Sequence, residues 1–457
     1  MFYVVPAGTT PSPDALIDAP FILSVPRLGY LFLSGTLSMF TASSSSSLLR
    51  RWVALLLTGV LAGLGGMLLA LLLHEIQHLA YGYSQHTLLG PRSFLQGVSD
   101  AATPRRFLVL AAAGIVAGGG WWLLGRYGKK RVSISAAVAS PDIPMPPKTT
   151  LVHILLQIVT VAMGSPLGRE VAPREAGALF AGGIARRLHL SREEIRLMIA
   201  CGSGAGLAAV YNVPLAGAIF TLEVLLVSFN REAALAALTT SALAAWIASL
   251  GLGDEHQYRF TAEAAGLSLV FWGMLSGPLF GAAAFLFRRL TQRARAKVRA
   301  NWQMPVFSLV AFLLLAALAV WFPQLPGNGK GPTQLTLSGD VTLPLAVALL
   351  CLKVLVIWAV LRGGAEGGLL TPGLTVGALL GSLIFLLLGR YFPGSDMAGF
   401  ALTGAAGFLS ASMMMPITAA MLMLEFTRMD HSFIVPVALC VAGAFTTCRL
   451  LEGASKG

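Results

Sequence analysis

Ten apolar runs follow one another along this chain of 457 residues, and they constrain its fold more than any other feature. Only 11% of the residues are charged, whereas soluble globular proteins carry about 25%. Water cannot solvate so many apolar segments, so we predict one polytopic α-helical domain in a lipid bilayer, with well over ten membrane helices, some too short to cross. The runs cover residues 52–73, 106–125, 150–163, 197–229, 233–252, 264–287, 306–321, 343–361, 372–389 and 398–447.

The charged residues lie mainly between these runs, and their balance is basic, with 32 Lys and Arg against 20 Asp and Glu. A basic balance can indicate nucleic-acid binding, but basic clusters beside apolar runs are typical of cytoplasmic anchors, so no nucleic-acid partner is expected. The clusters are Arg50-Arg51, Arg126 to Arg131, Arg186-Arg187 and Arg288 to Arg299. Residues 1–49 are rich in Pro, Ser and Thr, lack the pattern of a cleaved signal, and are predicted to form a poorly specified extension.

A short pattern occurs twice, which indicates an internal repeat. Pro214 to Glu223 and Pro416 to Glu425 both read Pro, apolar, two small or neutral residues, Ala, four apolar or neutral residues and Glu, at an offset of 202 residues. A Gly- and Pro-bearing segment precedes each copy, and the same offset carries Glu170 onto Pro372. Repeated halves are common in membrane transport proteins, so we predict a first half at about 50–252 and a second at about 260–450.

Glu170 lies in a glycine-punctuated apolar region, where a carboxylate costs about 2.5–3.5 kcal/mol or more and normally has a function. Gly and Pro at membrane depth interrupt helices and leave helix N-termini inside the protein. Each N-terminus offers unpaired N–H groups and a partial positive charge, so several that converge form an anion site. A carboxylate at that site mimics the anion and leaves when it is protonated. The sequence therefore predicts anion conduction with an acid-sensitive gate at Glu170.

The chain resembles the CLC family of chloride channels and proton-coupled anion transporters over about residues 50–450. Gly168-Arg169-Glu170-Val171-Ala172-Pro173 is similar to the family's Gly-Arg-Glu-Gly-Pro motif, and Gly368-Leu369-Leu370-Thr371-Pro372 is similar to Gly-x-Phe-x-Pro. The two repeated Pro segments match as well, and Lys353 and Gly327-Asn328-Gly329 fall where the family often has them.

The resemblance implies a CLC-type all-α fold of two inverted helical repeats with re-entrant and broken helices, assembled as a homodimer in a bacterial inner membrane. It implies Glu170 as the gate and chloride or a similar anion as the cargo, without a cofactor or metal. The anion-binding residues that it implies are Gly168, Arg169, Glu170, Val171, Gly368, Leu369 and Leu370.

Three departures from the family pattern bear on mechanism. Val224 stands where proton-coupled members carry a second glutamate, so proton antiport is in doubt, although a strictly proton-coupled antiporter of chloride or nitrate stays an alternative. Residues 140–144 are a distorted counterpart of the selectivity loop, with Pro141 at the position that contacts the anion. No Tyr follows Tyr391 at the place of the family's inner-gate tyrosine, so the inner gate is expected to be absent or to be formed by another residue.

An alternative from another class comes from the string His74-Glu75-Ile76-Gln77-His78. Two His four residues apart on a helix can bind zinc with the Glu as base, as in metalloproteases, yet no third ligand motif is evident. An interfacial helix end is the other interpretation of this string. Glu223 and Glu425 are predicted to cap backbone N–H groups or anchor at the interface, and Lys353 to attract anions or to snorkel.

Overall fold

The computed structural model describes residues 45–83, 92–254, 256–260, 262 and 264–455. The N-terminal extension predicted for residues 1–49 lies almost wholly outside these ranges. Residues 49–457 form one compact unit. Its described residues are helical apart from connecting segments and contain no strand, only a single antiparallel bridge between Gly168 and Gly368.

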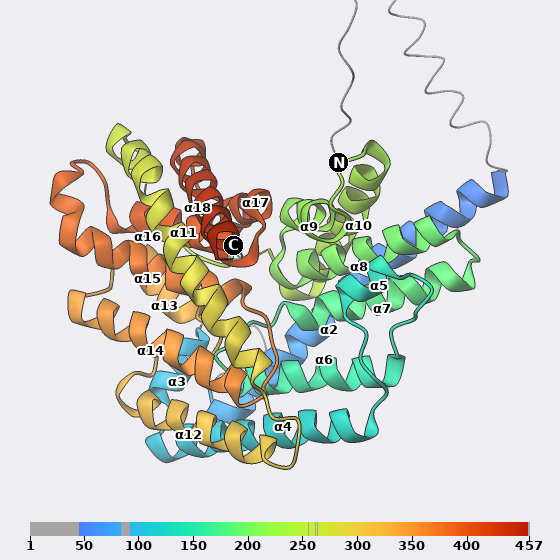
Figure 1. Cartoon of the computed structure of the whole chain (residues 1–457), viewed down its shortest axis with the longest axis horizontal. Coiled ribbons are helices and arrows are strands. Elements are labelled where there is room, and N and C mark those ends of the chain that lie inside the picture. The colour runs from blue at the N-terminus through green and yellow to red at the C-terminus, as the bar shows by residue number, and fades with distance from the viewer. Residues whose placement is uncertain (1–44, 84–91, 255, 261, 263, 456–457) are drawn as a thin grey trace, which may run out of the picture. The chain divides into compact units, whose positions relative to one another are not determined.

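The helices in chain order are α2 (Ser45–Tyr81), α3 (Phe94–Asp100), α4 (Thr103–Tyr127), α5 (Ile134–Ala139), α6 (Pro147–Ala162), α7 (Val171–Arg187), α8 (Arg192–Tyr211), α9 (Pro214–Phe220), η1 (Thr221–Leu226), α10 (Arg231–Leu252), α11 (Leu267–Ala296), α12 (Met304–Trp321), α13 (Lys330–Leu337), α14 (Leu343–Arg362), α15 (Leu370–Leu388), η2 (Gly389–Tyr391), α16 (Met397–Met413), α17 (Pro416–Thr427), η3 (His431–Phe433) and α18 (Ile434–Ala454) (Figure 1).

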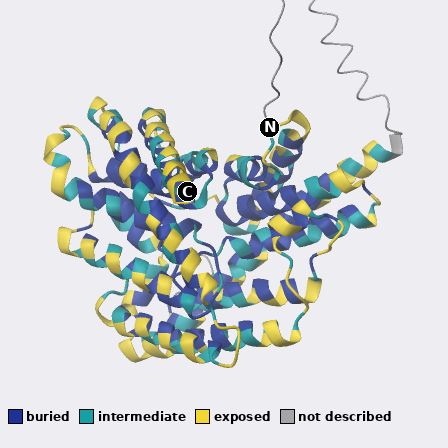
Figure 2. Cartoon of the chain, in the orientation of Figure 1, coloured by how far each residue is buried: buried dark blue, intermediate teal, exposed yellow. Residues whose placement is uncertain are grey.

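Eight of the described helices are long and apolar enough to cross a membrane, and four apolar helices of 10–17 residues are shorter. Large apolar side chains remain exposed on many outer helix faces, while the faces that pack together are buried (Figure 2). An apolar outer surface of this extent suits contact with lipid rather than water. The prediction of a polytopic all-α membrane protein with long and short helices is confirmed.

The two halves repeat the same local backbone geometry. The residue before each repeated Val-Pro or Met-Pro pair, Asn212 or Met414, ends its helix in the left-handed conformation with φ of 55° and 56°. Pro214 and Pro416 then occupy the first turn of α9 and α17, where a missing N–H breaks no helical hydrogen bond. The offset of 202 residues predicted from the sequence therefore holds for these helices.

The offset changes upstream. Gly168 pairs with Gly368 through two backbone hydrogen bonds, with N···O distances of 2.8 and 3.0 Å, which is an offset of 200 residues. The starts of the two helices, Val171 and Leu370, differ by 199 residues, so Glu170 corresponds to Leu369 or Leu370, and the expectation that it corresponds to Pro372 was wrong. Segments of slightly different length between the glycine motif and the Pro segment account for the difference.

Glu223 and Glu425 join the halves reciprocally. The carboxylate of Glu425 accepts hydrogen bonds from the N–H groups of Leu215 and Ala216 at 3.0 and 2.7 Å, in the first turn of α9. The carboxylate of Glu223 accepts from Ile417 and Thr418 at 2.9 and 2.7 Å, in the first turn of α17. The predicted capping role is confirmed, and each carboxylate caps the helix of the opposite repeat.

Candidate functional site: a buried carboxylate between two helix starts

The starts of α7 and α15 face one another where the Gly168–Gly368 bridge joins their leading segments. Both helices carry Pro as their third residue, Pro173 and Pro372, in a first turn whose N–H groups have no partner within the helix. Free N–H groups and the partial positive ends of two helices thus meet inside the protein. The sequence predicted this convergence from its Gly and Pro punctuation.

Glu170 places its carboxylate in this space, with 1% of the residue exposed. One carboxylate oxygen, Oε1, accepts a hydrogen bond from the backbone N–H of Leu370 at 3.0 Å, and Oε2 accepts one from the Tyr211 hydroxyl at 3.2 Å. A Cβ added to Gly168 or Gly368 would overlap these carboxylate oxygens. The two glycines are therefore what allows a negative group to lie directly against the backbone.

The structure brings together most of the residues predicted for the anion site. Gly168, Arg169, Glu170 and Val171 form the start of α7, and Gly368, Leu369 and Leu370 form the start of α15. The Arg169 guanidinium lies 5.3 Å from the centre of the Tyr211 ring, outside the hydrogen bonds to the carboxylate. The described hydrogen bonds of the carboxylate come from N–H and O–H groups, and Arg174 acts on it only electrostatically, without a hydrogen bond.

Tyr211 and Thr371 belong to the site although the sequence did not single them out. The Tyr211 hydroxyl lies 2.9 Å from the Thr371 hydroxyl, so it bridges α8, Glu170 and the first turn of α15. The available signal was position, since Tyr211 directly precedes the repeated segment that starts at Asn212. A recess beside the site is lined by Arg169, Tyr211, Gln257, Tyr258, Asn328, Lys330, Thr371 and Phe426.

Pro141 does not lie with this group. It follows the C-terminal end of α5, and its carbonyl accepts a hydrogen bond from Arg186 at 2.8 Å. Arg186 is at the far end of α7, about 24 Å from Glu170 along the helix axis at 1.5 Å per residue. The C-terminal end of a helix is also the wrong pole for an anion. The assignment of Pro141 to the anion site was wrong.

Lys353 is fully buried in the middle of α14, with 0% exposed. Its ammonium donates hydrogen bonds to the carbonyls of Leu325 at 2.7 Å and Gly327 at 2.6 Å. The predicted snorkelling is therefore wrong, since the side chain points into the protein. It fixes α14 to the segment that leads into α13.

The string from His74 to His78 lies in the last two turns of α2, which ends at Tyr81. The ring centres of His74 and His78 lie 6.5 Å apart. The described residues contain no group of three His, Cys, Asp or Glu side chains that could hold a metal. His78 packs instead against the ring of Tyr83 at 4.7 Å. The geometry favours the interpretation of a helix end over a zinc site.

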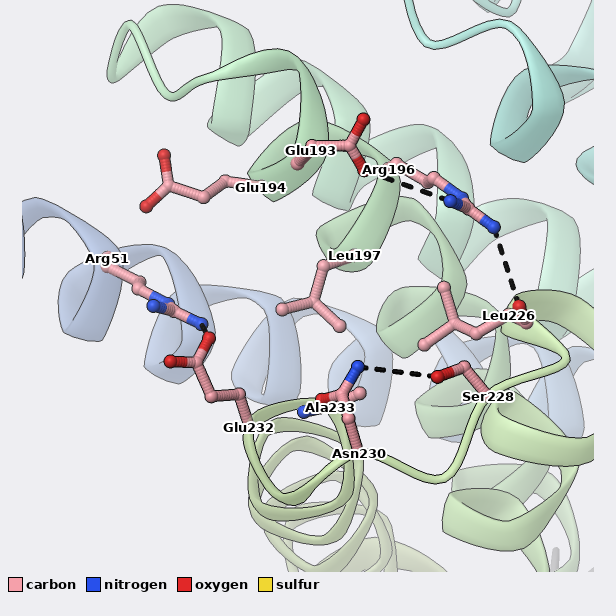
Figure 3. A pocket seen from close by; sticks show the side chains of 10 residues that line it. All are labelled: Arg51, Glu193, Glu194, Arg196, Leu197, Leu226, Ser228, Asn230, Glu232 and Ala233. Atoms are coloured by element: carbon pink, nitrogen blue, oxygen red, sulfur yellow. Dashed lines mark hydrogen bonds and ion pairs between the residues drawn. The ribbon is translucent and has the colours of Figure 1, made fainter. Parts of the chain in front are cut away.

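Val224 lies in the π-helix η1, partly buried against the main core, and carries no ionisable group. A separate hollow opens near the C-terminal end of η1, where α2, α8 and α10 meet (Figure 3). Surface ion pairs line it, Arg51 with Glu232 at 2.8 Å and Arg196 with Glu193 at 3.8 Å. None of its lining residues belongs to the Glu170 site.

Helix starts that meet around a buried carboxylate inside a polytopic membrane protein are typical of proteins that pass ions through the bilayer. Comparison with known proteins agrees. The sequence model of the family described as voltage gated chloride channel matches residues 105–449. The chain belongs to this family, which is the CLC family predicted from its motifs.

Curated relatives and solved structures match over most of the chain. The ClC-type chloride channel ClcB of Shigella flexneri is 32% identical over 290 residues, which are 61% of this chain and 68% of the relative. The ClcB channel of Salmonella typhi is 29% identical over 83% of this chain and 91% of its own length. The structure of a slow cyanobacterial Cl⁻/H⁺ antiporter superposes with a TM-score of 0.76 and 18% identity, covering 88% of this chain and 95% of that one.

A second solved structure, a CLC-type fluoride/proton antiporter, superposes with a TM-score of 0.71 and 19% identity, covering 89% of this chain and 97% of that one. At this identity the likeness concerns the fold. The predicted CLC-type fold of two inverted repeats is confirmed.

Proposed function

We propose that this protein transports chloride or a similar small anion along a pathway that passes between the starts of α7 and α15, with the carboxyl group of Glu170 as its gate. One observation carries the proposal. The buried carboxylate of Glu170 takes hydrogen bonds from the Leu370 N–H and the Tyr211 hydroxyl, so it already fills a site built for a negative charge.

The gate follows from the chemistry of this site. The ionised carboxylate accepts the donors that a passing anion needs, and the two cannot occupy the same place. A protonated carboxyl has lost its charge, binds these dipoles less well, and yields the place to the anion. Among the described residues no lysine or arginine donates a hydrogen bond to the carboxylate, so a bound anion has no direct cationic ligand and can leave again.

The test is Glu170→Gln in the full-length protein, reconstituted in liposomes loaded with chloride. The amide keeps the shape of the side chain but cannot ionise, so we expect chloride efflux at neutral pH to equal that at acidic pH. The native protein and Glu193→Gln, which removes an exposed carboxylate on α8, should both be faster in acid. Unchanged acid activation in Glu170→Gln would refute the gate, and absence of efflux from the native protein would refute the transport function.

We further propose that the protein lies in a bacterial inner membrane, since its relatives include bacterial channels of the same family, and that it is a homodimer, as its resemblance to that family implies. The chain has a mass of 47.9 kDa. Light scattering of the detergent-solubilised protein, corrected for detergent, should give twice this mass. A single-chain mass at all protein concentrations would contradict the dimer.

Proton coupling through position 224 is not expected, since Val224 cannot carry a proton. The two superposed structures are a Cl⁻/H⁺ and a fluoride/proton antiporter, which keeps coupling by another route open as a question about this chain. Simultaneous records of chloride efflux and proton uptake in the same liposomes answer it.

A further inference from the structure

A second group of ionisable side chains is buried between α6 and α7, away from the helix starts that hold Glu170. His153 is 1% exposed, Glu175 is 5% exposed and Gln157 is 0% exposed. Arg131 and Glu366 complete the group and remain about a third exposed. Buried carboxylates and imidazoles at membrane depth are expensive, so they normally mark an ion path or a proton relay.

The contacts fix how these side chains face one another. The Trp121 indole N–H donates to Nδ1 of His153 at 2.9 Å. The other ring nitrogen, Nε2, lies 3.5 Å from Glu175 Oε2 and 3.8 Å from Glu366 Oε2. One ring nitrogen thus lies between the buried carboxyl and the partly exposed one.

Charges of both signs surround Glu175 and His153. Arg131 contacts both ring nitrogens of His153 and pairs with Glu366 at 2.6 Å. Arg174 on α7 interacts electrostatically with both Glu175 and Glu170, and Arg295 at the end of α11 interacts with Glu366. Acids and bases therefore face the group from α7, from α11 and from the segments that carry Arg131 and Glu366.

Glu175 has few hydrogen bonds for a carboxylate that stays ionised. Among the described residues its hydrogen-bond donor is the amide of Gln157 at 3.1 Å, with His153 Nε2 slightly farther away. The other end of the same amide, Gln157 Oε1, is buried and accepts no hydrogen bond from the described residues. A carboxyl that is protonated part of the time can donate as well as accept, and this suits a site with an unused acceptor nearby.

The position of the group connects it to the gate. Glu175 follows Glu170 by five residues on α7, about 7.5 Å along the helix axis. Glu366 precedes by two residues the Gly368 that lies against the Glu170 carboxylate. The group therefore extends from a partly exposed acid among basic helix ends to a buried acid about one and a half helical turns from the gate.

We propose that Glu175 is a proton-carrying residue of this transporter, which exchanges protons with Glu366 on one side and with Glu170 on the other. Each step moves one proton from a carboxylic acid to a carboxylate, directly or through water, and leaves the donor ionised. Gln157 is a positioning residue, because its amide N–H donates to the Glu175 carboxyl, and His153 lies 3.5 Å from the same oxygen. The proposal rests on the proposed anion transport and supplies a proton route that does not use position 224.

The experiment records chloride efflux and proton uptake together in liposomes that contain the full-length protein. In liposomes with the native protein, chloride that leaves down its gradient should drive protons into the liposomes. Glu175→Gln keeps the hydrogen-bonding shape but cannot carry a proton, so proton uptake should fall roughly a hundredfold, as on loss of a positioned proton donor, with chloride efflux near native. Glu175→Asp should restore part of the uptake, and the exposed control Glu193→Gln should behave as the native protein.

Three results would overturn the role of Glu175. These are chloride efflux without proton uptake in the native protein, native proton uptake in Glu175→Gln, and loss of both fluxes in Glu175→Gln and Glu175→Asp, which would show a structural role. Failure of the transport proposal looks different, since no chloride would move at all. In that case infrared difference spectra between acidic and alkaline buffer still decide, because Glu175→Gln must lack one carboxylic acid band of the native protein.

Discussion

Two glycines decide what can occupy the space between α7 and α15. The Cβ positions of Gly168 and Gly368 coincide with the oxygens of the Glu170 carboxylate. Any side chain there would remove the carboxylate and, equally, any anion that takes its place. The absence of a side chain at these two residues is thus as much part of the site as the N–H donors.

Gly368→Ala tests this at the residue scale. The methyl group should lower chloride efflux at every pH, both in the native protein and in Glu170→Gln, because it fills the anion's place as well as the carboxylate's. Overpacking costs about 1–3 kcal/mol, which corresponds to roughly a 5- to 150-fold loss of anion occupancy. The measurement is chloride efflux from liposomes.

Gly183→Ala is the matched control, since a Cβ at this residue of α7 meets no atom within 4 Å. It should leave efflux unchanged. If Gly368→Ala in the Glu170→Gln background still conducts at the rate of Glu170→Gln alone, the anion does not pass over Gly368.

At the scale of helices, the reciprocal caps show why neither half is complete alone. Pro214 and Pro416 begin α9 and α17, and the N–H groups of each first turn have no acceptor within their own helix. The carboxylate that satisfies them comes from the other repeat, from Glu425 or Glu223. Separation of the halves would leave both helix starts without acceptors.

Glu425→Ala should therefore lower the thermal midpoint of the detergent-solubilised protein, because the N–H groups of Leu215 and Ala216 lose their acceptor. Loss of a helix cap costs about 0.5–2 kcal/mol. Glu223→Ala should act similarly, and the double variant should unfold at a lower temperature than either. Glu193→Ala, which removes an exposed carboxylate of α8, should not shift the midpoint. A midpoint unchanged in the double variant would show that the caps do not stabilise the fold.

The repeat, the caps and the buried helix starts could be predicted from the sequence because each depends on Gly, Pro or Glu at a recognisable position. The pattern around Pro214 and Pro416 predicted the repeat and the capping, and the motif around Gly168 predicted the helix starts. It could not predict the two-residue change of offset upstream, which requires the pairing of Gly168 with Gly368 to be seen. Pro141 was misassigned because a segment similar to the selectivity loop, such as residues 140–144, can lie at either end of a short helix.

The residues that the sequence missed, or whose role it misjudged, are those whose contacts are made with partners far along the chain. Tyr211 reaches Glu170 from 41 residues away, and Lys353 finds its carbonyl partners 26 and 28 residues earlier. Glu175, His153 and Glu366 come from three segments that no spacing relates. Apolar periodicity places their helices in the bilayer but does not say which polar faces meet.

At the scale of the whole molecule, the basic helix ends define a direction across the membrane. Arg131 after α4 and Arg295 at the end of α11 meet at residues Glu366 and Gly367, which follow α14. The ends of three helices that cross the bilayer thus gather on one side. An excess of Arg and Lys is typical of the cytoplasmic side, so we predict that these helix ends face the cytoplasm.

The chain path then assigns opposite sides to two exposed residues. Arg293 lies in the last turn of α11, whereas Asp340 lies between α13 and α14. α12 crosses between them with 18 residues, and α14 returns with 20, about 27 and 30 Å at 1.5 Å per residue. Asp340 therefore belongs to the outer side.

The labelling experiment uses a background with Cys351→Ser, which removes the exposed native thiol. An impermeant thiol reagent should label Asp340→Cys in intact spheroplasts, and Arg293→Cys only after permeabilisation. The three other native cysteines are buried and should stay unlabelled in both cases. Labelling of Arg293→Cys from outside would show the opposite orientation in the membrane. Glu366, with the proposed proton entrance, would then lie on the outer face.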